Sequence, residues 1–255
     1  MSQIQATATI ITHNEAQHIV ACIRSVDWFA EVLVVDSGSN DETVTLARAA
    51  GARVIENSWP GFGLQKQFAI DHASHAWVFS LDADERVSEA LKHSIQALLA
   101  TEPTHSAYRI NRCNHFMGRP LRHGEGYPDW CLRLFNQHQA RWSDDVVHEK
   151  VLFDGQAGKL QGDLDHYSQE SLAAYLGKQN RYTTLQAEGL YAQGKDASLM
   201  KLTLSPLVRF IKFYLLRLGF LDGVPGLVHI AVGCFNSFVK YAKLRELCLR
   251  NGKPH

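Results

Sequence analysis

The chain has 255 residues, of which 45% are apolar and 20% charged, and this suits one large or two small globular domains. Lys plus Arg and Asp plus Glu number 26 each, and this zero net charge argues against a nucleic-acid-binding protein. The five cysteines form no CxxC pair, which argues against a disulfide framework or a zinc site and favours a reducing, cytosolic compartment.

The first hundred residues alternate between strand and helix patterns. The continuous apolar run at 31–36 is typical of a strand that is buried on both faces. Strands are expected at 6–14, 31–36, 52–56 and 76–82, and helices at 15–26, 41–51, 63–74 and 88–100. This order predicts an α/β fold with a Rossmann-like, mostly parallel sheet flanked by helices.

Polar side chains follow the first two strands of this predicted sheet. Thr12, Asn14 and Glu15 lie at the end of the first strand, and Asp36 ends the second. Ligands of parallel sheets bind at the carboxyl ends of the strands, so these residues are expected to line one crevice. The alternative is a local role, because Asn14 and Asp36 also suit helix N-caps and Glu15 suits a first helical turn.

The fourth strand runs into the sequence LDADE, which places Asp82 and Asp84 two residues apart. In an extended chain both carboxylates face the same side, and such oxygen ligands suit Mg²⁺ or Mn²⁺ bound together with substrate phosphates. The alternative is that Asp82 caps a helix and Asp84 is solvated. Convergence with the other two strand ends favours the metal site.

The stretch PGFGLQKQ at 60–67 contains GxG but lacks the third glycine of a dinucleotide-binding fingerprint. Its glycines permit a close backbone approach, and Lys66 is placed to reach a diphosphate. A loop with a surface lysine is the alternative.

Residues 107–166 are rich in aromatic, His, Arg and Gly residues, with strand patterns at 107–112 and 131–136, and are expected to close over the crevice. Glu149 is a candidate general base, because it lies in a short segment flanked by apolar residues, where a carboxylate can have a raised pKa. Its neighbour His148 is also a candidate site residue. The sequence leaves four rivals for the base, which are Glu125, Asp129, Asp144 and Asp145.

From residue 168 onwards the pattern is helical. Segment 201–250 is apolar and basic, and on a helical wheel its first part places the basic residues Lys201, Arg209, Lys212 and Arg217 on one side. The opposite side carries Leu207, Phe210, Ile211, Tyr214 and Leu218. This arrangement is typical of a helix that lies in a membrane interface. The alternative is a helix packed on the protein's own core or on a partner subunit.

Seven stretches resemble motifs of a known family. IITHNEAQHIVACIRSV, EVLVVDSGSNDET, PGFGLQKQFAI and FSLDADE resemble the successive motifs of family 2 glycosyltransferases with the GT-A fold. HGEGYPDWCLRLF, DDVVHEKV and GFLDGVPGL are similar to the lipopolysaccharide core β-1,4-glucosyltransferase group of Gram-negative bacteria. The expected organisation is a GT-A domain at 1–166, with a donor half at about 1–100 and an acceptor half at about 101–166, followed by a helical extension at 167–255.

The resemblance implies roles for the candidate residues. Thr12, Asn14, Glu15 and Asp36 would hold the uridine, Lys66 the diphosphate, and Asp82 and Asp84 the metal, with His148 as a further metal or phosphate neighbour. Relatives often have Arg-Asn where this chain has Lys66-Gln67. Many relatives also carry the general base in a Glu-Asp pair, and this chain has VHE in its place. Glu149 is therefore the candidate base, and Asp84 is the second candidate catalytic residue.

The implied activity is a metal-dependent, inverting transfer of glucose from UDP-glucose to the heptose region of the lipopolysaccharide inner core. The acceptor would be the lipid A–core precursor, and segment 201–250 would hold the enzyme on the cytoplasmic face of the inner membrane. Alternatives are another nucleotide sugar or acceptor, such as a capsule or lipid-carrier glycan, and a non-catalytic nucleotide-sugar-binding protein. An NAD-dependent dehydrogenase is disfavoured by the missing GxGxxG.

Overall fold

The computed structural model describes residues 3–143, 145, 149–167 and 171–251. It divides the chain into two compact units, the first formed by Met1–Cys113 with Pro128–Tyr167 and the second by Asn114–Tyr127 with Ser168–His255. The segment Asn114–Tyr127 lies within the range expected for the acceptor half, but the structure groups it with the C-terminal helices.

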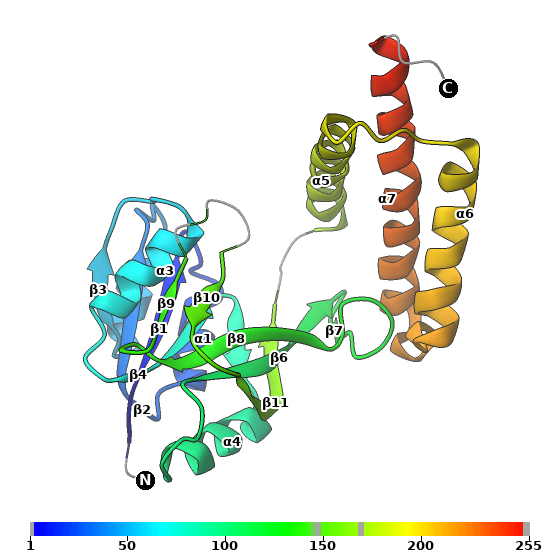
Figure 1. The fold of residues 1–255 in the computed structure, drawn as a ribbon. Coiled ribbons are helices and arrows are strands. Elements are labelled where there is room, and N and C mark those ends of the chain that lie inside the picture. Colours follow the sequence, from blue (N-terminus) through cyan, green and yellow to red (C-terminus); the bar gives the residue numbers. More distant parts are fainter. Residues whose placement is uncertain (1–2, 144, 146–148, 168–170, 252–255) are drawn as a thin grey trace. The chain divides into compact units, whose positions relative to one another are not determined.

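The first unit is built on one large mixed sheet, which confirms the predicted α/β class (Figure 1). Its parallel part has the order β3 (Arg53–Glu56), β2 (Phe29–Asp36), β1 (Ile4–Thr12) and β4 (Trp77–Asp82). The sheet continues through β8 (Asp129–Asn136), β6 (Ala107–Phe116), β11 (Gly158–His166) and β5 (Glu85–Val87).

This second half of the sheet corrects the prediction of a mostly parallel sheet. Strand β8 runs antiparallel to both β4 and β6, and β11 runs antiparallel to β5. Parallel neighbours need a crossover connection, usually a helix, and the described part of residues 101–166 contains no helix. The segment expected to close over the crevice therefore extends the sheet itself.

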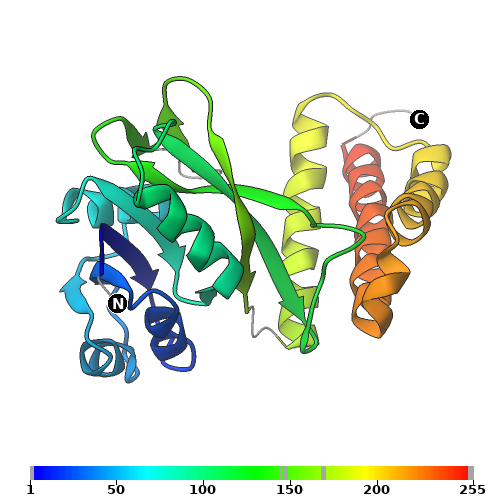
Figure 2. The same ribbon diagram turned by 90° about the horizontal axis from the view of Figure 1, so that it is seen from below.

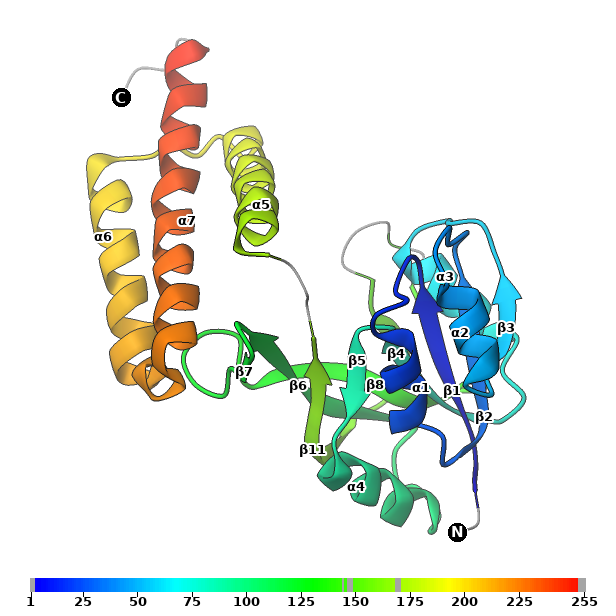
Figure 3. The same cartoon turned by 180° about the vertical axis from the view of Figure 1, so that it is seen from behind.

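Helices cover both faces of the sheet (Figures 1 and 3). Helices α1 (Ile19–Ser25), α2 (Thr43–Ala49) and α4 (Glu89–Leu99) share one core with β1, and α3 (Phe62–Asp71) covers the other face together with the hairpin β9 (Ala140–Trp142) and β10 (Val151–Phe153). Successive β1 residues alternate between the cores, because Ile10 belongs to the first and Ile11 to the second.

Glu31 on β2 links three segments of the first unit. Its carboxylate accepts hydrogen bonds from the Thr7 hydroxyl at 2.6 Å, the Ser74 backbone N–H at 2.7 Å and Arg53 Nε at 2.9 Å. Burial raises the pKa of Glu31, but these hydrogen bonds outweigh it and hold the pKa below its ordinary value of 4.5. The ionised carboxylate therefore stabilises the fold.

We expect Glu31→Gln to lower the free energy of unfolding at neutral pH by about 1–3 kcal/mol, because the charge that strengthens these bonds is lost. The pKa of Glu31 is lower in the folded state than its ordinary value of 4.5. The stabilisation is therefore fully present above pH 4.5 and disappears as the pH falls through the folded-state pKa. Urea denaturation of both proteins at neutral and acidic pH measures the difference. The control is Glu56→Gln, which removes an exposed partner of Arg48. If the stability difference between the wild type and Glu31→Gln does not become smaller in acid, this account is contradicted.

The second unit contains three long helical segments. They are α5 (Leu172–Ala192), α6 (Leu199–Phe210) with the π-helical turn η1 (Ile211–Leu216), and α7 (Gly223–Arg250), which follows the 3₁₀ turn η2 (Gly219–Asp222). Helix α7 packs between α5 and α6 (Figures 1 and 2). No single described helix has the length and apolarity of a membrane span, whereas the pair Leu199–Leu216 and Gly219–Arg250, bent by 73°, meets both criteria jointly.

The segment 114–127 docks on the turn between α6 and α7. The backbone N–H of His123 donates to Asp222 Oδ2 at 2.8 Å, and its Nδ1 lies 2.8 Å from Asp222 Oδ1. Gly124, at φ +71°, donates its N–H to the Arg217 carbonyl, and a Cβ there would lie 3.0 Å from Ile230 Cδ1. The sequences HGEG and GFLDGVPG are therefore packed against each other.

Candidate active site

The polar ends of the parallel strands lie side by side. In the strand register Thr12 is opposite Asp36, and its neighbour Ile11 is opposite Asp82. The predicted convergence of the three strand ends at one edge of the sheet is thus confirmed. This is the edge at which open α/β sheets bind ligands.

Hydrogen bonds join the loops after β1 and β2. The N–H groups of Asn14 and Glu15 donate to Ser39 Oγ and Thr43 Oγ1, both at 2.8 Å, and Asn14 Oδ1 accepts the N–H of Asn40 at 2.9 Å. Asn14 has φ +55°, in the left-handed region, and so lies outside any helix. The helix expected at 15–26 is shorter and spans Ile19–Ser25, after a turn at residues 16–18.

Asp36 shapes the second of these loops. Its buried carboxylate accepts the N–H groups of Gly38 at 2.9 Å and Ser39 at 2.8 Å, and it also accepts the Ser39 hydroxyl. Thr12, which ends β1 beside Asp36, is also buried, and its Oγ1 has no hydrogen-bond partner among the described residues. Burial, together with the charges of Asp84 and Asp41, raises the pKa of Glu15 to about 7.

Asp82 belongs to a chain of alternating charges. Lys66 Nζ on α3 lies 3.5 Å from Asp82 Oδ1 and 3.1 Å from Glu149 Oε1, and Arg133 Nη2 on β8 lies 3.0 Å from Asp82 Oδ2. Burial raises the pKa of Asp82, but Arg133 and Lys66 outweigh it and hold the pKa well below its usual range. The structure thus brings together three candidates, Lys66, Asp82 and Glu149. It also pairs Asp82 with Arg133, a residue that sequence reasoning missed.

Arg133 also binds Glu85, which is fully buried, with Nη2 2.6 Å from Glu85 Oε1. Arg112 on β6 extends the network to Asp129 through two contacts, at 3.0 Å from Nε and 2.8 Å from Nη2. An arginine within the apolar stretch CLRLF was the available signal for this network. Its partner carboxylates lie about fifty residues away in the sequence and could not be assigned from it.

Asp84 has a different partner. Its Oδ2 lies 3.0 Å from His166 Nε2 at the end of β11, and both side chains are about one-quarter exposed. A carboxylate and an imidazole in this arrangement suit a divalent cation such as Mn²⁺, whereas Asp82 is already matched by two cations of the chain itself. The donor set therefore fits a metal at Asp84 and His166. A site shared by Asp82 and Asp84 stays a prediction.

The segment that carries Glu149 approaches α3 closely. A Cβ at Gly63, in the first turn of α3, would lie 2.4 Å from the Ser143 carbonyl oxygen and 3.3 Å from Glu149 Cβ. The glycine of PGFG therefore admits this segment, which brings Glu149 to Lys66. Among the other candidates, Asp145 is exposed, Glu125 pairs with Arg209 in the second unit, and Asp144 and His148 lie outside the described residues.

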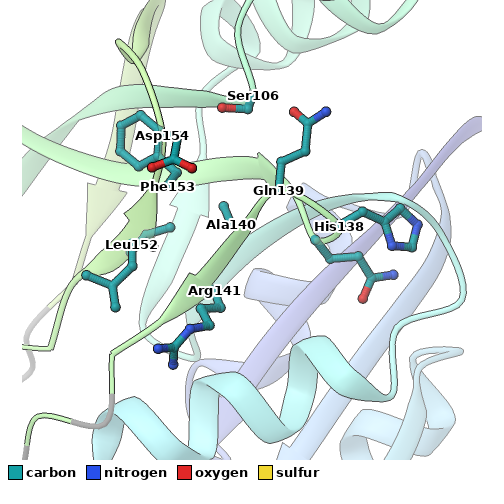
Figure 4. Close-up of a pocket in the computed structure, with 10 residues that line it drawn as sticks. Ser106, His138, Gln139, Ala140, Arg141, Leu152, Phe153 and Asp154 are labelled. Carbon is teal, nitrogen blue, oxygen red and sulfur yellow. The ribbon is translucent and has the colours of Figure 1, made fainter.

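A hollow of about 870 Å³ lies near the opposite ends of these strands (Figure 4). It is lined by Ser106 and by residues 137–141 and 151–154. Asn136, which precedes this lining, pairs with Trp77 at the start of β4, whereas Asp82 ends that strand. The hollow is therefore separate from the candidate active site.

The mixed α/β sheet, with this charged cluster at the ends of its parallel strands, agrees with the GT-A fold that the sequence predicts. The model of glycosyl transferase family 2 matches residues 7–155, and the chain belongs to this family. An uncharacterized glycosyltransferase of Rickettsia typhi is 34% identical over 95% of this chain and 87% of its own length. The lipopolysaccharide core biosynthesis glycosyltransferase LpsC of Rhizobium meliloti is 30% identical over 99% of this chain and 96% of its own.

Proposed function

We propose that the protein is an inverting, metal-dependent hexosyltransferase that moves glucose from UDP-glucose to the heptose region of the lipopolysaccharide inner core. The observation that carries this proposal is the pairing of Asp84 with His166 beside the Lys66–Asp82 pair at one edge of the sheet. The name of the Rhizobium meliloti relative, which is similar over nearly the whole chain, supports a role in lipopolysaccharide core synthesis.

The donor site is assigned to residues of the first unit. Thr12, Asn14, Glu15 and Asp36 bind the uridine, for which the loops after β1 and β2 are preorganised by their mutual hydrogen bonds. Asp84 and His166 would hold Mg²⁺ or Mn²⁺, which when bound neutralises charge on the leaving diphosphate. Lys66 adds a fixed positive charge, because its ammonium group is buried between two carboxylates.

The general base in this proposal is Glu149. A carboxylate takes the proton of the acceptor hydroxyl while that oxygen attacks the anomeric carbon from the face opposite the leaving group. A single displacement inverts the configuration, so that an α-linked donor gives a β-linked product. Lys66 Nζ, 3.1 Å from Glu149 Oε1, orients the carboxylate.

We expect Glu149→Gln to lower kcat by about 10²–10⁴-fold with little change in donor binding, because only proton removal is lost. The matched control is Asp129→Asn, since Asp129 is a rival base whose carboxylate is held by Arg112. Steady-state transfer and calorimetric UDP binding distinguish the two variants. A larger loss of kcat in Asp129→Asn would assign the base to Asp129 instead.

The acceptor in this proposal is membrane-anchored lipid A–core. We propose that the enzyme works as a peripheral protein on the cytoplasmic face of the inner membrane, held there by residues 201–250. The exposed apolar side chains of α6, such as Leu204, Leu207 and Val208, support this assignment.

A transfer assay with a panel of nucleotide sugars tests the proposed reaction. Detergent-dispersed lipopolysaccharide that ends in heptose should accept glucose from UDP-glucose, whereas lipopolysaccharide without heptose should not. If glucose is not transferred from UDP-glucose and only another nucleotide sugar serves as donor, the proposed donor is wrong. If lipopolysaccharide without heptose accepts the sugar, the proposed acceptor is wrong.

A further inference from the structure

Charge is distributed unevenly along this electrically neutral chain. Residues 199–250, from α6 to α7, contain eight Lys and Arg but only two acidic residues, Asp222 and Glu246. Because the whole chain has 26 residues of each sign, the remainder has 18 basic and 24 acidic residues. The α6–α7 hairpin is therefore strongly basic and is attracted to an anionic surface.

Helix α6 and the turn η1 that follows it expose an apolar stripe, the α6 stripe, instead of burying it. Its members recur at intervals of three or four residues and are between 41% and 67% exposed: Met200, Leu204, Leu207, Val208, Ile211 and Leu215. A helix in a soluble protein normally turns such a stripe towards the core. Exposed apolar area of this kind marks a surface that contacts a partner or a membrane.

A groove of about 660 Å³ separates α6 from α7 beside this stripe. It is lined by four cations, Lys201, Arg209 and Lys212 from the α6 side and Lys240 from α7. Apolar lining comes from the stripe itself through Met200, Leu204 and Val208. Figures 1 and 3 show the two helices side by side along their length.

Glu125, the carboxylate in this lining, is already neutralised. Arg209 Nε donates to Glu125 Oε2 at 3.0 Å, and Nη2 makes a second contact with Oε1. Gly233 on α7 makes room for the pair, since a Cβ there would lie 2.8 Å from Glu125 Oε2. The pair fixes the base of the groove.

The three lysines have no such partner. Among the described residues no carboxylate pairs with Lys201, Lys212 or Lys240. Lys212 and Lys240 lie 5.2 Å and 4.7 Å from the ring centres of Phe213 and Tyr241, and Lys201 donates to the Asp196 carbonyl. Three lysines without a carboxylate partner thus line one groove, whose single carboxylate is paired with Arg209.

We propose that this groove binds the phosphate of an anionic phospholipid of the bilayer while the α6 stripe lies among the acyl chains. The inference rests on the proposed work at a membrane but concerns a site apart from the donor site. Free phosphate would use the lysines and leave the stripe in water. A second copy would bring the same lysines against each other, and like charges oppose such a contact.

Vesicle sedimentation tests the proposal on the full-length protein. The wild type should bind vesicles that contain phosphatidylglycerol and not vesicles of phosphatidylcholine alone. Lys201→Glu with Lys240→Glu should weaken binding to the anionic vesicles at least about tenfold, because each basic residue near such a surface contributes about 1 kcal/mol. The matched control, Lys195→Glu with Arg250→Glu, changes the charge equally at residues that do not line the groove and should retain more than half of the binding.

Three results would overturn the proposal. They are equal losses in the two charge-reversed pairs, release of the wild type by inorganic phosphate, and a wild-type dimer in sedimentation velocity that the groove variant dissociates. Metal-dependent UDP binding, measured on the same samples, should be unchanged in both pairs. Its absence in the wild type would count against the proposed function alone, since vesicle binding does not need the donor site.

Discussion

Replacing Asp84 by Ala is expected to reduce sugar transfer by at least about 10²–10³-fold, the loss seen when one preorganised electrostatic contact to a developing charge is removed. Asp84 is about one-quarter exposed and its carboxylate pairs with His166, while its backbone carbonyl accepts the Tyr167 N–H whatever the side chain. The variant should therefore stay folded. The measurement is steady-state transfer, with far-UV circular dichroism and urea unfolding for the fold.

The same loss is expected for His166→Ala, and the double variant should lose little more than either single one, because two residues that act as a unit are not additive. Asp27→Ala is the matched control, since it removes an exposed carboxylate for which no side-chain bond is found among the described residues. The assignment of these two residues to one metal would be wrong if Asp84→Ala retained its transfer activity. It would also be wrong if the fold-loss of activity in the double variant were the product of the losses in the two single variants.

Replacing Arg133 by Met is expected to lower the free energy of unfolding by about 3–5 kcal/mol, because it removes the hydrogen-bonded cation from the fully buried carboxylate of Glu85. Arg133 Nη2 lies 2.6 Å from Glu85 Oε1 and 3.0 Å from Asp82 Oδ2, and Glu85 is fully buried. Urea unfolding measures the loss. Adding Glu85→Gln to the variant should restore part of the stability, since the uncompensated buried charge is then removed.

The control for Arg133 is Arg48→Met, which breaks an exposed pair with Glu56 and should change stability by no more than about 1 kcal/mol. If Arg133→Met lowers the free energy of unfolding by no more than this control does, the ion pairs of Arg133 at the end of β4 are not shielded from water. The chain Lys66–Asp82–Arg133 could then not act as a rigid support for the donor site.

The parallel part of the fold could be predicted from local patterns. Apolar runs such as 31–36 and polar residues directly after them, such as Asp36 and Asp82, identify both the strands and the edge at which they end. The spacing of apolar residues and the residue types that form turns both depend only on residues close together in the sequence. The alternation of strands and helices therefore predicted four parallel strands and the edge at which their polar ends meet, whereas the order of these strands in the sheet was not predicted.

Pairings between distant residues could not be predicted in this way. His166 meets Asp84 only because β11 pairs antiparallel with β5, and nothing local to either residue indicates that register. The motif HGEG is a similar case, since its Glu125 appears in the sequence as a candidate base but pairs with Arg209 in the second unit. Charged residues that bind each other look the same in a sequence as charged residues that bind substrate.

Thermal unfolding with UDP and UDP-glucose, with Mn²⁺, with Mg²⁺ and with a chelator, tests the central claim most directly. A ligand that binds only the folded state raises its stability, by about 2.7 kcal/mol at a concentration a hundred times its Kd. We predict stabilisation by UDP or UDP-glucose that requires the metal and is lost in Asp84→Ala. Stabilisation that is independent of metal, or a response to NAD alone, would contradict a metal–diphosphate site at the end of β4.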